Sequence, residues 1–317
     1  MFRTPVEIPF SNLKITYHDR VTTLGSCFAE NIGKRMNDAC FLTDMNPFGV
    51  LYNPVSIKNS LCLLHNYKQF TIDDIFEHNS MWQSFSHSTQ FSHPSAEPCL
   101  EQINSRLDAA RSFYKHSDIL IITFGTAWVF EDITTGKVVS NCHKLPAKNF
   151  TRRRLTVQEI VDDYIMIICK LLTDNPTLQI IFSVSPIRHW KDGAHENNIS
   201  KSILLLAIDE LQKRFEQIHY FPAYEIQMDE LRDYRFYASD MQHPSDVAVD
   251  YIWEKFCQNY FDKPTSKIKK ELEQLSADLN HRPLFPDSEE YQKFQANITK
   301  KKKELIACYP FLNDRLK

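Results

Sequence analysis

The chain has 317 residues, of which 43% are hydrophobic and 24% are charged, and its formal net charge is −3. These proportions are ordinary for a globular protein, so disorder is not expected. The sequence has no excess of positive charge and no basic stripe, which argues against a nucleic-acid-binding protein. The strongest apolar run, residues 203–208, is far shorter than the ~20 residues of a membrane span, so no membrane association is expected.

Eight cysteines are dispersed along the chain, and none of them forms a Cys-x-x-Cys pair. The first residues lack the continuous apolar core of a signal peptide. We therefore expect reduced thiols and a cytoplasmic protein.

Short apolar runs alternate with amphipathic stretches, which is typical of an α/β protein. Strands are predicted at residues 21–24, 119–124, 178–184 and 219–224. Helices are predicted at about 27–38 and 100–114, from the capping box at 156–159, from Ser200, and after Ser245 as the N-cap. The expected fold is a three-layer α/β/α sandwich with a mostly parallel sheet of about five strands and right-handed crossovers.

The character of the sequence changes after residue 262, where two charged helices are predicted at 265–279 and 287–306. We therefore divide the chain into a main domain, residues 1–262, and a C-terminal helical extension, residues 263–317. The lysine run at 300–303 is interpreted as a solvated helix face. A polar and aromatic segment at about 66–98 is interpreted as an insertion or a lid.

The first candidate for chemistry is the turn Gly25-Ser26-Cys27, which joins a buried strand to a predicted helix. Open α/β sheets place their sites at the carboxyl ends of strands. A helix N-terminus offers free N–H groups and a partial positive charge, which can activate a thiol and stabilise an oxyanion. The alternative is a tight turn with a structural cysteine.

The second candidate is the pair Asp240 and His243, just before a predicted helix. An aspartate three residues before a histidine can orient the imidazole and stabilise its protonated form. The alternative is an aspartate that caps a local turn beside an ordinary loop histidine.

Together, the two motifs resemble the layout of SGNH/GDSL hydrolases, in which the nucleophile turn comes first and Asp-x-x-His last. Gly-Ser-Cys-Phe-Ala at 25–29 resembles the motif that gives the GSCFA family its name. Further segments resemble that family at 46–54, 124–128, 141–146, 183–189, 192–194 and 234–237. The resemblance covers roughly residues 20–255 and implies an SGNH-like, flavodoxin-like fold and an acyl-hydrolase-like site.

The sequence departs from the superfamily in two places. Alignment of Gly25-Ser26-Cys27 with Gly-Asp-Ser makes Cys27 the nucleophile. If the alignment is shifted by one residue, Ser26 is the nucleophile instead. We prefer Cys27, because a thiolate is a better nucleophile near neutral pH than an unactivated hydroxyl. The Gly-x-Asn-Asp segment is replaced by Gly125-Thr126-Ala127-Trp128, which lacks the asparagine. The candidate oxyanion donors are then the backbone N–H groups of Cys27, Gly49 and Gly125 and the side chain of Asn141.

Arg188 and His189 follow a predicted strand, and we expect them to bind an anionic or hydroxyl-rich part of the substrate. The alternative is an arginine paired with a structural carboxylate. Trp128 and His143 complete the predicted substrate-binding set. Cys142, His143, His189 and His195 lack the spacing of zinc ligands, and the chain has no glycine-rich phosphate loop, so neither a metal nor a cofactor is expected.

The predicted function is that of an acyl hydrolase acting on an ester or thioester of a small molecule or glycan. Cys27, or Ser26, attacks the carbonyl, His243 transfers protons and Asp240 orients His243. Two alternatives stay open: a binding module without catalysis on a hydrolase fold, and an acyltransferase that excludes water.

Overall fold

The computed structural model describes residues 4–279, 281, 284–285 and 287–316. A five-stranded sheet in the order β10-β9-β5-β1-β2 crosses its centre. The strands are β1 (Arg20–Gly25), β2 (Leu42–Met45), β5 (Ile119–Phe124), β9 (Gln179–Val184) and β10 (Ile218–Phe221). Every adjacent pair is parallel, so the carboxyl ends of all five strands meet at one edge of the sheet.

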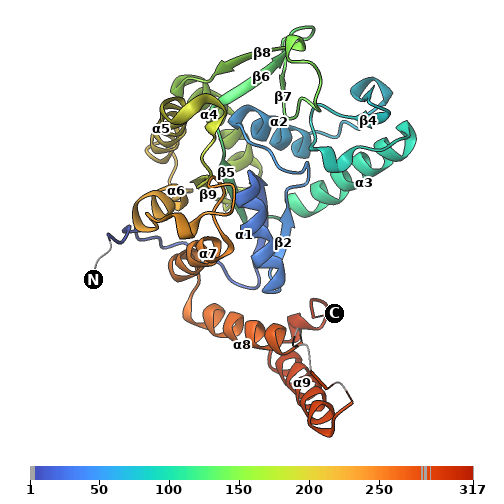
Figure 1. Cartoon of the computed structure of the whole chain (residues 1–317), viewed down its shortest axis with the longest axis vertical. Coiled ribbons are helices and arrows are strands. Elements are labelled where there is room, and N and C mark those ends of the chain that lie inside the picture. Colours follow the sequence, from blue (N-terminus) through green and yellow to red (C-terminus); the bar gives the residue numbers. More distant parts are fainter. Residues whose placement is uncertain (1–3, 280, 282–283, 286, 317) are drawn as a thin grey trace.

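Helices cover both faces of this sheet, as Figure 1 shows, and the predicted α/β/α sandwich is confirmed. One face packs against α2 (Pro54–His65), α3 (Ala96–Tyr114), α4 (Val157–Asp174) and α5 (Gly193–Gln212). The other face packs against α1 (Cys27–Asp38), the short α6 (Ala223–Glu225) and α7 (Asp246–Tyr260).

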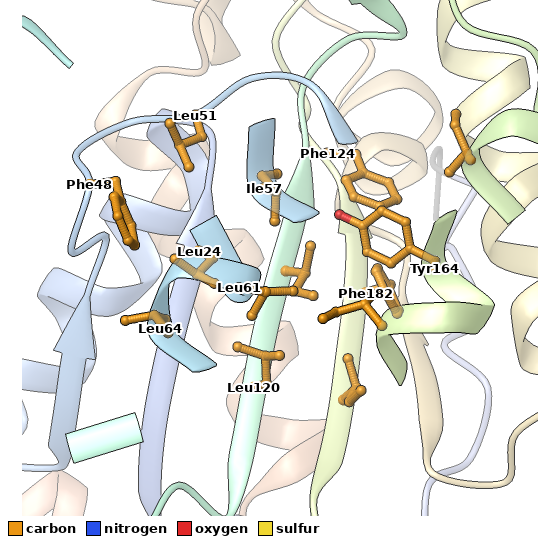
Figure 2. Close-up of a cluster of buried hydrophobic side chains, with 14 of the residues drawn as sticks. Leu24, Phe48, Leu51, Ile57, Leu61, Leu64, Leu120, Phe124, Tyr164 and Phe182 are labelled. Atoms are coloured by element: carbon orange, nitrogen blue, oxygen red, sulfur yellow. The ribbon is translucent and has the colours of Figure 1, made fainter. Parts of the chain in front are cut away.

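Strand β5 shows why the sheet is buried on both sides. Leu120 and Phe124 belong to the hydrophobic cluster on one face, whereas Ile119 and Ile121 belong to the cluster on the other. Successive side chains of a strand point to opposite faces, so a run with apolar residues at every position requires cover on both. Figure 2 shows the first cluster, in which side chains of β1, β5 and β9 pack against α2 and against Tyr164 of α4.

Two small antiparallel sheets lie outside the sandwich, and neither was predicted. The first contains β7 (Val138–Val139), β6 (Trp128–Asp132) and β8 (Phe150–Arg154), in that order. The second is a hairpin of β3 (Phe76–His78) and β4 (Met81–Gln83), within the segment interpreted as an insertion or lid.

The C-terminal helices α8 (Lys263–Leu279) and α9 (Glu289–Cys308) project from one end of the main domain (Figure 1). Leu272 and Leu305 join the same hydrophobic cluster as α1 and α7. After α9 the chain returns, and the guanidinium of Arg315 donates hydrogen bonds to the backbone oxygens of Tyr17 and Cys40, at 2.9 and 3.1 Å. The extension is therefore attached to the main domain by both apolar and polar contacts.

Two boundaries and one strand show how the structure differs from the predictions. Helix α5 begins at Gly193 and not at Ser200, because its first two turns are polar and show no apolar periodicity. Strand β10 ends at Phe221, because Pro222 follows it. Strand β2 has four half-buried side chains and gave no sequence signal. No helix among the described residues combines the length and the apolar character that a bilayer span requires.

Candidate functional site

The turn at the end of β1 requires glycine at position 25. Gly25 has a φ of +137°, and a Cβ atom there would lie 2.2 Å from the backbone oxygen of Thr123 in β5. The next residue, Ser26, donates its N–H to the same oxygen at 3.2 Å. This close approach directs the chain sharply from β1 into α1, whose first residue is Cys27.

Ser26 and Cys27 have different environments. Ser26 is 1% exposed, and its side chain accepts a hydrogen bond from the N–H of Phe28 as the N-cap of α1. Cys27 is half-buried, and its Sγ lies 3.7 Å from the hydroxyl of Tyr52. As the first residue of a helix, Cys27 also presents a backbone N–H that has no acceptor within the helix. The structure thus gives Ser26 a capping position and Cys27 an accessible one.

Asp240 and His243 form a closely bonded pair before α7. Oδ2 of Asp240 lies 2.5 Å from Nδ1 of His243, and Oδ1 accepts the backbone N–H groups of Gln242 and His243 at 2.9 and 3.0 Å. These two backbone bonds, followed by the bond from the imidazole, lower the pKa of Asp240 to about 2. The carboxylate therefore caps the turn and orients the imidazole at once, so both interpretations of this motif apply.

The segment between β2 and α2 is fixed to the end of β1. Asn46 accepts the N–H of Gly25 with its side-chain oxygen at 2.9 Å, and the N–H of Leu51 donates to the Gly25 oxygen at 2.8 Å. The same segment continues to Tyr52, whose backbone oxygen accepts the N–H groups of Gly125 and Thr126 at 2.8 and 2.9 Å. It therefore joins the carboxyl ends of β1 and β5.

These bonds change the set of oxyanion donors expected from the sequence. The N–H of Gly49 donates to the Asn46 oxygen at 2.7 Å, and the N–H of Gly125 donates to Tyr52, so neither amide is available to a substrate. The Asn141 amide nitrogen has two N–H groups and donates one hydrogen bond, to the Thr89 hydroxyl at 3.1 Å, so it can still donate another. The Cys27 amide and Asn141 remain from the predicted set.

A pocket of about 390 Å³ lies beside this edge of the sheet. Among the predicted site residues, it is lined by His243, Arg188, His189, Trp128 and Asn141. Its wall also includes Phe130 and Val139 of the small β7-β6-β8 sheet. No residue of 66–98, a range that the structure describes completely, lines it.

Cys27 and Asp240 do not line this pocket themselves, but each contacts a residue that does. Cys27 is connected to it through Tyr52, which lines the pocket and contacts the thiol. Asp240 is connected through its bond to His243. Of the predicted catalytic residues, His243 lines the pocket, and Cys27 and Asp240 each contact a residue that lines it.

Positive charge predominates around the pocket. Asp192 is bound by both terminal nitrogens of Arg152, which holds its pKa below the usual value. Arg188 and Lys191 have no carboxylate partner among the described residues; they lie over the rings of Trp190 and Phe130, at 5.7 and 5.0 Å. The alternative that Arg188 pairs with a structural carboxylate is therefore not realised.

His189 is a neutral side chain at neutral pH. Burial, and then the proximity of Lys201 and His243, lower its pKa to about 4. Its ring packs edge-on against Tyr52, with the centroids 6.3 Å apart. His189 can therefore exchange hydrogen bonds with a hydroxyl group, but it does not supply a cation.

His143 does not belong to the pocket, contrary to the sequence-based expectation. Its side chain is 5% exposed, and Nε2 bonds to the backbone oxygen of Ser84 at 2.8 Å. It lies behind the wall, next to Asn141 and Cys142, which do line the pocket. In the part of the chain that the structure describes, no three His, Cys, Asp or Glu side chains are grouped to hold a metal ion.

Two residues of this region were missed in the sequence. Tyr52 lies within a segment that resembles the family, but no chemical pattern marked it. Lys201 of α5 is 1% exposed, and its ammonium nitrogen bonds to the backbone oxygens of Gly125 and Ser185, at 2.7 and 2.8 Å. It joins the residues that follow β5 and β9, and a single lysine in a helix gives no sequence signal for this position.

The structure is an α/β/α sandwich in which the Gly25-Ser26-Cys27 turn comes first and Asp240-x-x-His243 last, an order that resembles that of SGNH/GDSL hydrolases. The chain belongs to the GSCFA family: the model of that family matches residues 20–256. A second model, described as the GSCFA domain protein, C-terminal domain, matches residues 272–314. No curated protein matches the chain.

Solved structures with a similar arrangement include carbohydrate esterases. A family 3 carbohydrate esterase from Clostridium thermocellum is 11% identical, with a TM-score of 0.33 over 80% of this chain and 98% of that chain. An acetyl xylan esterase from the rumen bacterium Butyrivibrio proteoclasticus is 14% identical, with a TM-score of 0.40 over 78% of this chain and 64% of that chain. This likeness is too distant to transfer an activity.

Proposed function

We propose that the protein is an acyl hydrolase that cleaves an ester or thioester with Cys27 as the nucleophile. The proposal rests on the different environments of the two side chains in the turn. Ser26 is buried as the N-cap, whereas the half-buried thiol of Cys27 contacts the hydroxyl of Tyr52, which lines the pocket. His243, oriented by Asp240, lines the same pocket.

The reaction has two steps. The Cys27 sulfur bonds to the acyl carbon while His243 accepts the thiol proton, and the bond to the leaving alcohol or thiol breaks as His243 returns that proton to it. Water then attacks the acyl-thioester, His243 accepts a proton from the water, and Cys27 leaves and is reprotonated. The Cys27 amide stabilises the oxyanion in both steps. In an acyltransferase, an acceptor hydroxyl or amine would replace the water.

The test is acyl release from short-chain p-nitrophenyl esters and the matching thioesters. We expect turnover by the wild type, loss of turnover in Cys27→Ala and His243→Ala, and near wild-type rates in Ser26→Ala. Loss in Ser26→Ala with retention in Cys27→Ala would transfer the nucleophile role to Ser26. Added acceptor alcohols distinguish hydrolysis from transfer, because only a transferase forms a new ester.

The charges of the pocket favour a substrate with an anionic group. Arg188 and Lys191 are cations without a carboxylate partner among the described residues, although the whole chain carries a net charge of −3. A carboxylate or phosphate on the substrate would form ion pairs with these two cations, and arginine can bind either group in a bidentate manner. We expect the mono-p-nitrophenyl ester of succinate to have a lower KM than p-nitrophenyl acetate.

Variants test this preference directly. Arg188→Gln should raise KM for the succinate monoester about tenfold and leave kcat and the acetate ester nearly unchanged. Lys137→Gln, which removes an exposed charge in the turn before β7, is the matched control. Equal effects of Arg188→Gln on both esters would contradict an anion site.

A binding module without catalysis is the second candidate, because the amides of Gly49 and Gly125 are engaged within the protein. Such a module needs no activated thiol. Rapid labelling of Cys27 by a thiol-directed probe at neutral pH, mapped to its peptide because the chain has eight cysteines, would favour the hydrolase. Labelling no faster than that of the exposed Cys169, with no turnover, would favour the module.

A further inference from the structure

We propose that Tyr52 is a further catalytic residue, whose hydroxyl donates a hydrogen bond to the oxyanion that forms on the acyl group bound to Cys27. The inference rests on the proposed function and names the group that replaces the missing asparagine side chain. It assigns a chemical role to the segment 46–54, for which the sequence gave only a family resemblance.

The Tyr52 hydroxyl lies close to the proposed nucleophile. It lies 3.7 Å from Sγ of Cys27, and the Tyr52 side chain, 39% exposed, lines the same pocket as His243. When the sulfur attacks, the carbonyl oxygen of the substrate becomes an oxyanion two covalent bonds from Sγ. A donor already in contact with the sulfur is therefore within reach of that oxygen without rearrangement of the backbone.

Backbone hydrogen bonds hold Tyr52 in this position. Its oxygen accepts the N–H groups of Gly125 and Thr126, and a Cβ atom at Gly125 would lie 2.9 Å from that oxygen. This is the segment that corresponds to the superfamily's Gly-x-Asn-Asp. The chain thus joins Tyr52 to the segment that lacks the asparagine, and the bond from Leu51 to Gly25 fixes it to the Gly25-Ser26-Cys27 turn as well. Such preorganisation is what an oxyanion donor needs.

The Tyr52 phenol also has the protonation state that the proposed role requires. A phenol can donate to an oxyanion only while it keeps its proton. Burial, and then the proximity and hydrogen bond of Cys27, raise the pKa of Tyr52 far above its usual value. The hydroxyl is therefore a donor throughout the pH range in which a thiol nucleophile works.

The first experiment compares Tyr52→Phe with the wild type on p-nitrophenyl and thioester substrates. We expect kcat to fall by about 10²–10³ with KM changed less than about threefold, because the bond forms only in the transition state. Tyr67→Phe, at a tyrosine that is 90% exposed and outside the pocket, should leave both constants unchanged. A kcat for Tyr52→Phe within threefold of the wild type would overturn the proposal.

A second readout does not depend on turnover. The alkylation rate of Cys27 by iodoacetamide, followed on its own peptide from pH 6 to 9, reports whether the Tyr52 hydroxyl contacts the sulfur, as the proposal requires. We expect the rate for Tyr52→Phe to differ at least threefold from that of the wild type. Identical profiles would show that the hydroxyl does not contact the reacting sulfur and would overturn the proposal.

The two readouts separate the two proposals. If the wild type shows no turnover, the acyl-hydrolase proposal fails, and the alkylation profile alone decides whether Tyr52 acts on Cys27. If the wild type turns over and Tyr52→Phe matches it in both readouts, the hydrolase proposal stands and Tyr52 is not its donor. Circular dichroism and thermal unfolding of Tyr52→Phe exclude a folding defect as the cause of any loss.

Discussion

Asp240 holds His243 by two separate contacts, one to the imidazole and one to the backbone. The carboxylate lies 2.5 Å from Nδ1, and its second oxygen accepts the N–H of His243 at 3.0 Å. The ring therefore cannot rotate away without breaking the first bond, and the turn cannot open without breaking the second. Because Nδ1 is bonded to Asp240, Nε2 on the other side of the ring points away from the carboxylate.

Asp240→Asn should lower kcat for ester cleavage by about 10²–10⁴ and leave KM nearly unchanged, because an amide can stabilise the wrong imidazole tautomer. His243→Ala should lose at least as much. The double variant should be no worse than His243→Ala alone, since the two residues act as a unit. Steady-state kinetics of the three variants checks this, and additive losses would show independent roles.

Ser26→Ala should lower the free energy of unfolding by about 0.5–2 kcal/mol, because it removes the N-cap of α1. Its rate of acyl release should stay within a few-fold of the wild type. Cys27→Ala should show the opposite pattern, with a nearly unchanged stability and no turnover. Urea denaturation together with kinetics separates the two patterns.

Gly25→Ala should prevent stable folding or cost more than about 4 kcal/mol, because its Cβ would overlap the Thr123 oxygen at 2.2 Å. Gly136→Ala is the matched control: its φ is also positive, at +65°, but no atom lies within 4 Å of the added Cβ. The control should cost only the backbone strain, about 1–2 kcal/mol. Equal losses in urea denaturation would contradict the close approach of β1 and β5.

Lys201 should give the protein a specific pH dependence of stability. Burial, and then the charge of Arg188, lower the pKa of Lys201 to about 7, below its ordinary value of 10.5. Between these values the unfolded chain binds more protons than the folded one, so this group's contribution to stability rises with pH, by at most about 1.4 kcal/mol per pH unit. Below about pH 7 both states are protonated and the contribution is flat.

Lys201→Met removes this group, so the difference in the free energy of unfolding between wild type and variant should move in favour of the wild type from pH 7 to 9. Guanidinium denaturation at several pH values measures it. Lys137→Met, at an exposed position, should show a constant difference. A constant difference for Lys201→Met as well would mean that the buried amine has an ordinary pKa.

The regular parts of the fold could be predicted because their signals are local. The all-apolar run at 119–124 requires cover on both faces, and the capping box at Thr156 and Glu159 marks the start of α4, as the structure shows. The Gly25-Ser26-Cys27 turn and the Asp240–His243 pair could be named because each motif lies within a few consecutive residues. The family assignment followed from the same motifs.

The remaining parts depend on contacts between distant segments. The approach of Tyr52 to Cys27, 25 residues away, arises from backbone bonds to β1 and β5 that no periodicity shows. His143 has the composition of a site residue, but the fold buries it against Ser84. The β7-β6-β8 sheet escaped prediction because its strands are short and half-buried.

The pocket is formed by two structurally different parts of the chain. One part lies at the ends of the parallel strands, where the turn at Gly25 leaves no freedom. Another part, around Trp128, Phe130 and Val139, comes from the antiparallel β7-β6-β8 sheet, which is separate from the five-stranded sheet. Substitutions of the pocket-facing side chains of this small sheet should therefore change which molecules fit, while the ends of the parallel strands keep their positions.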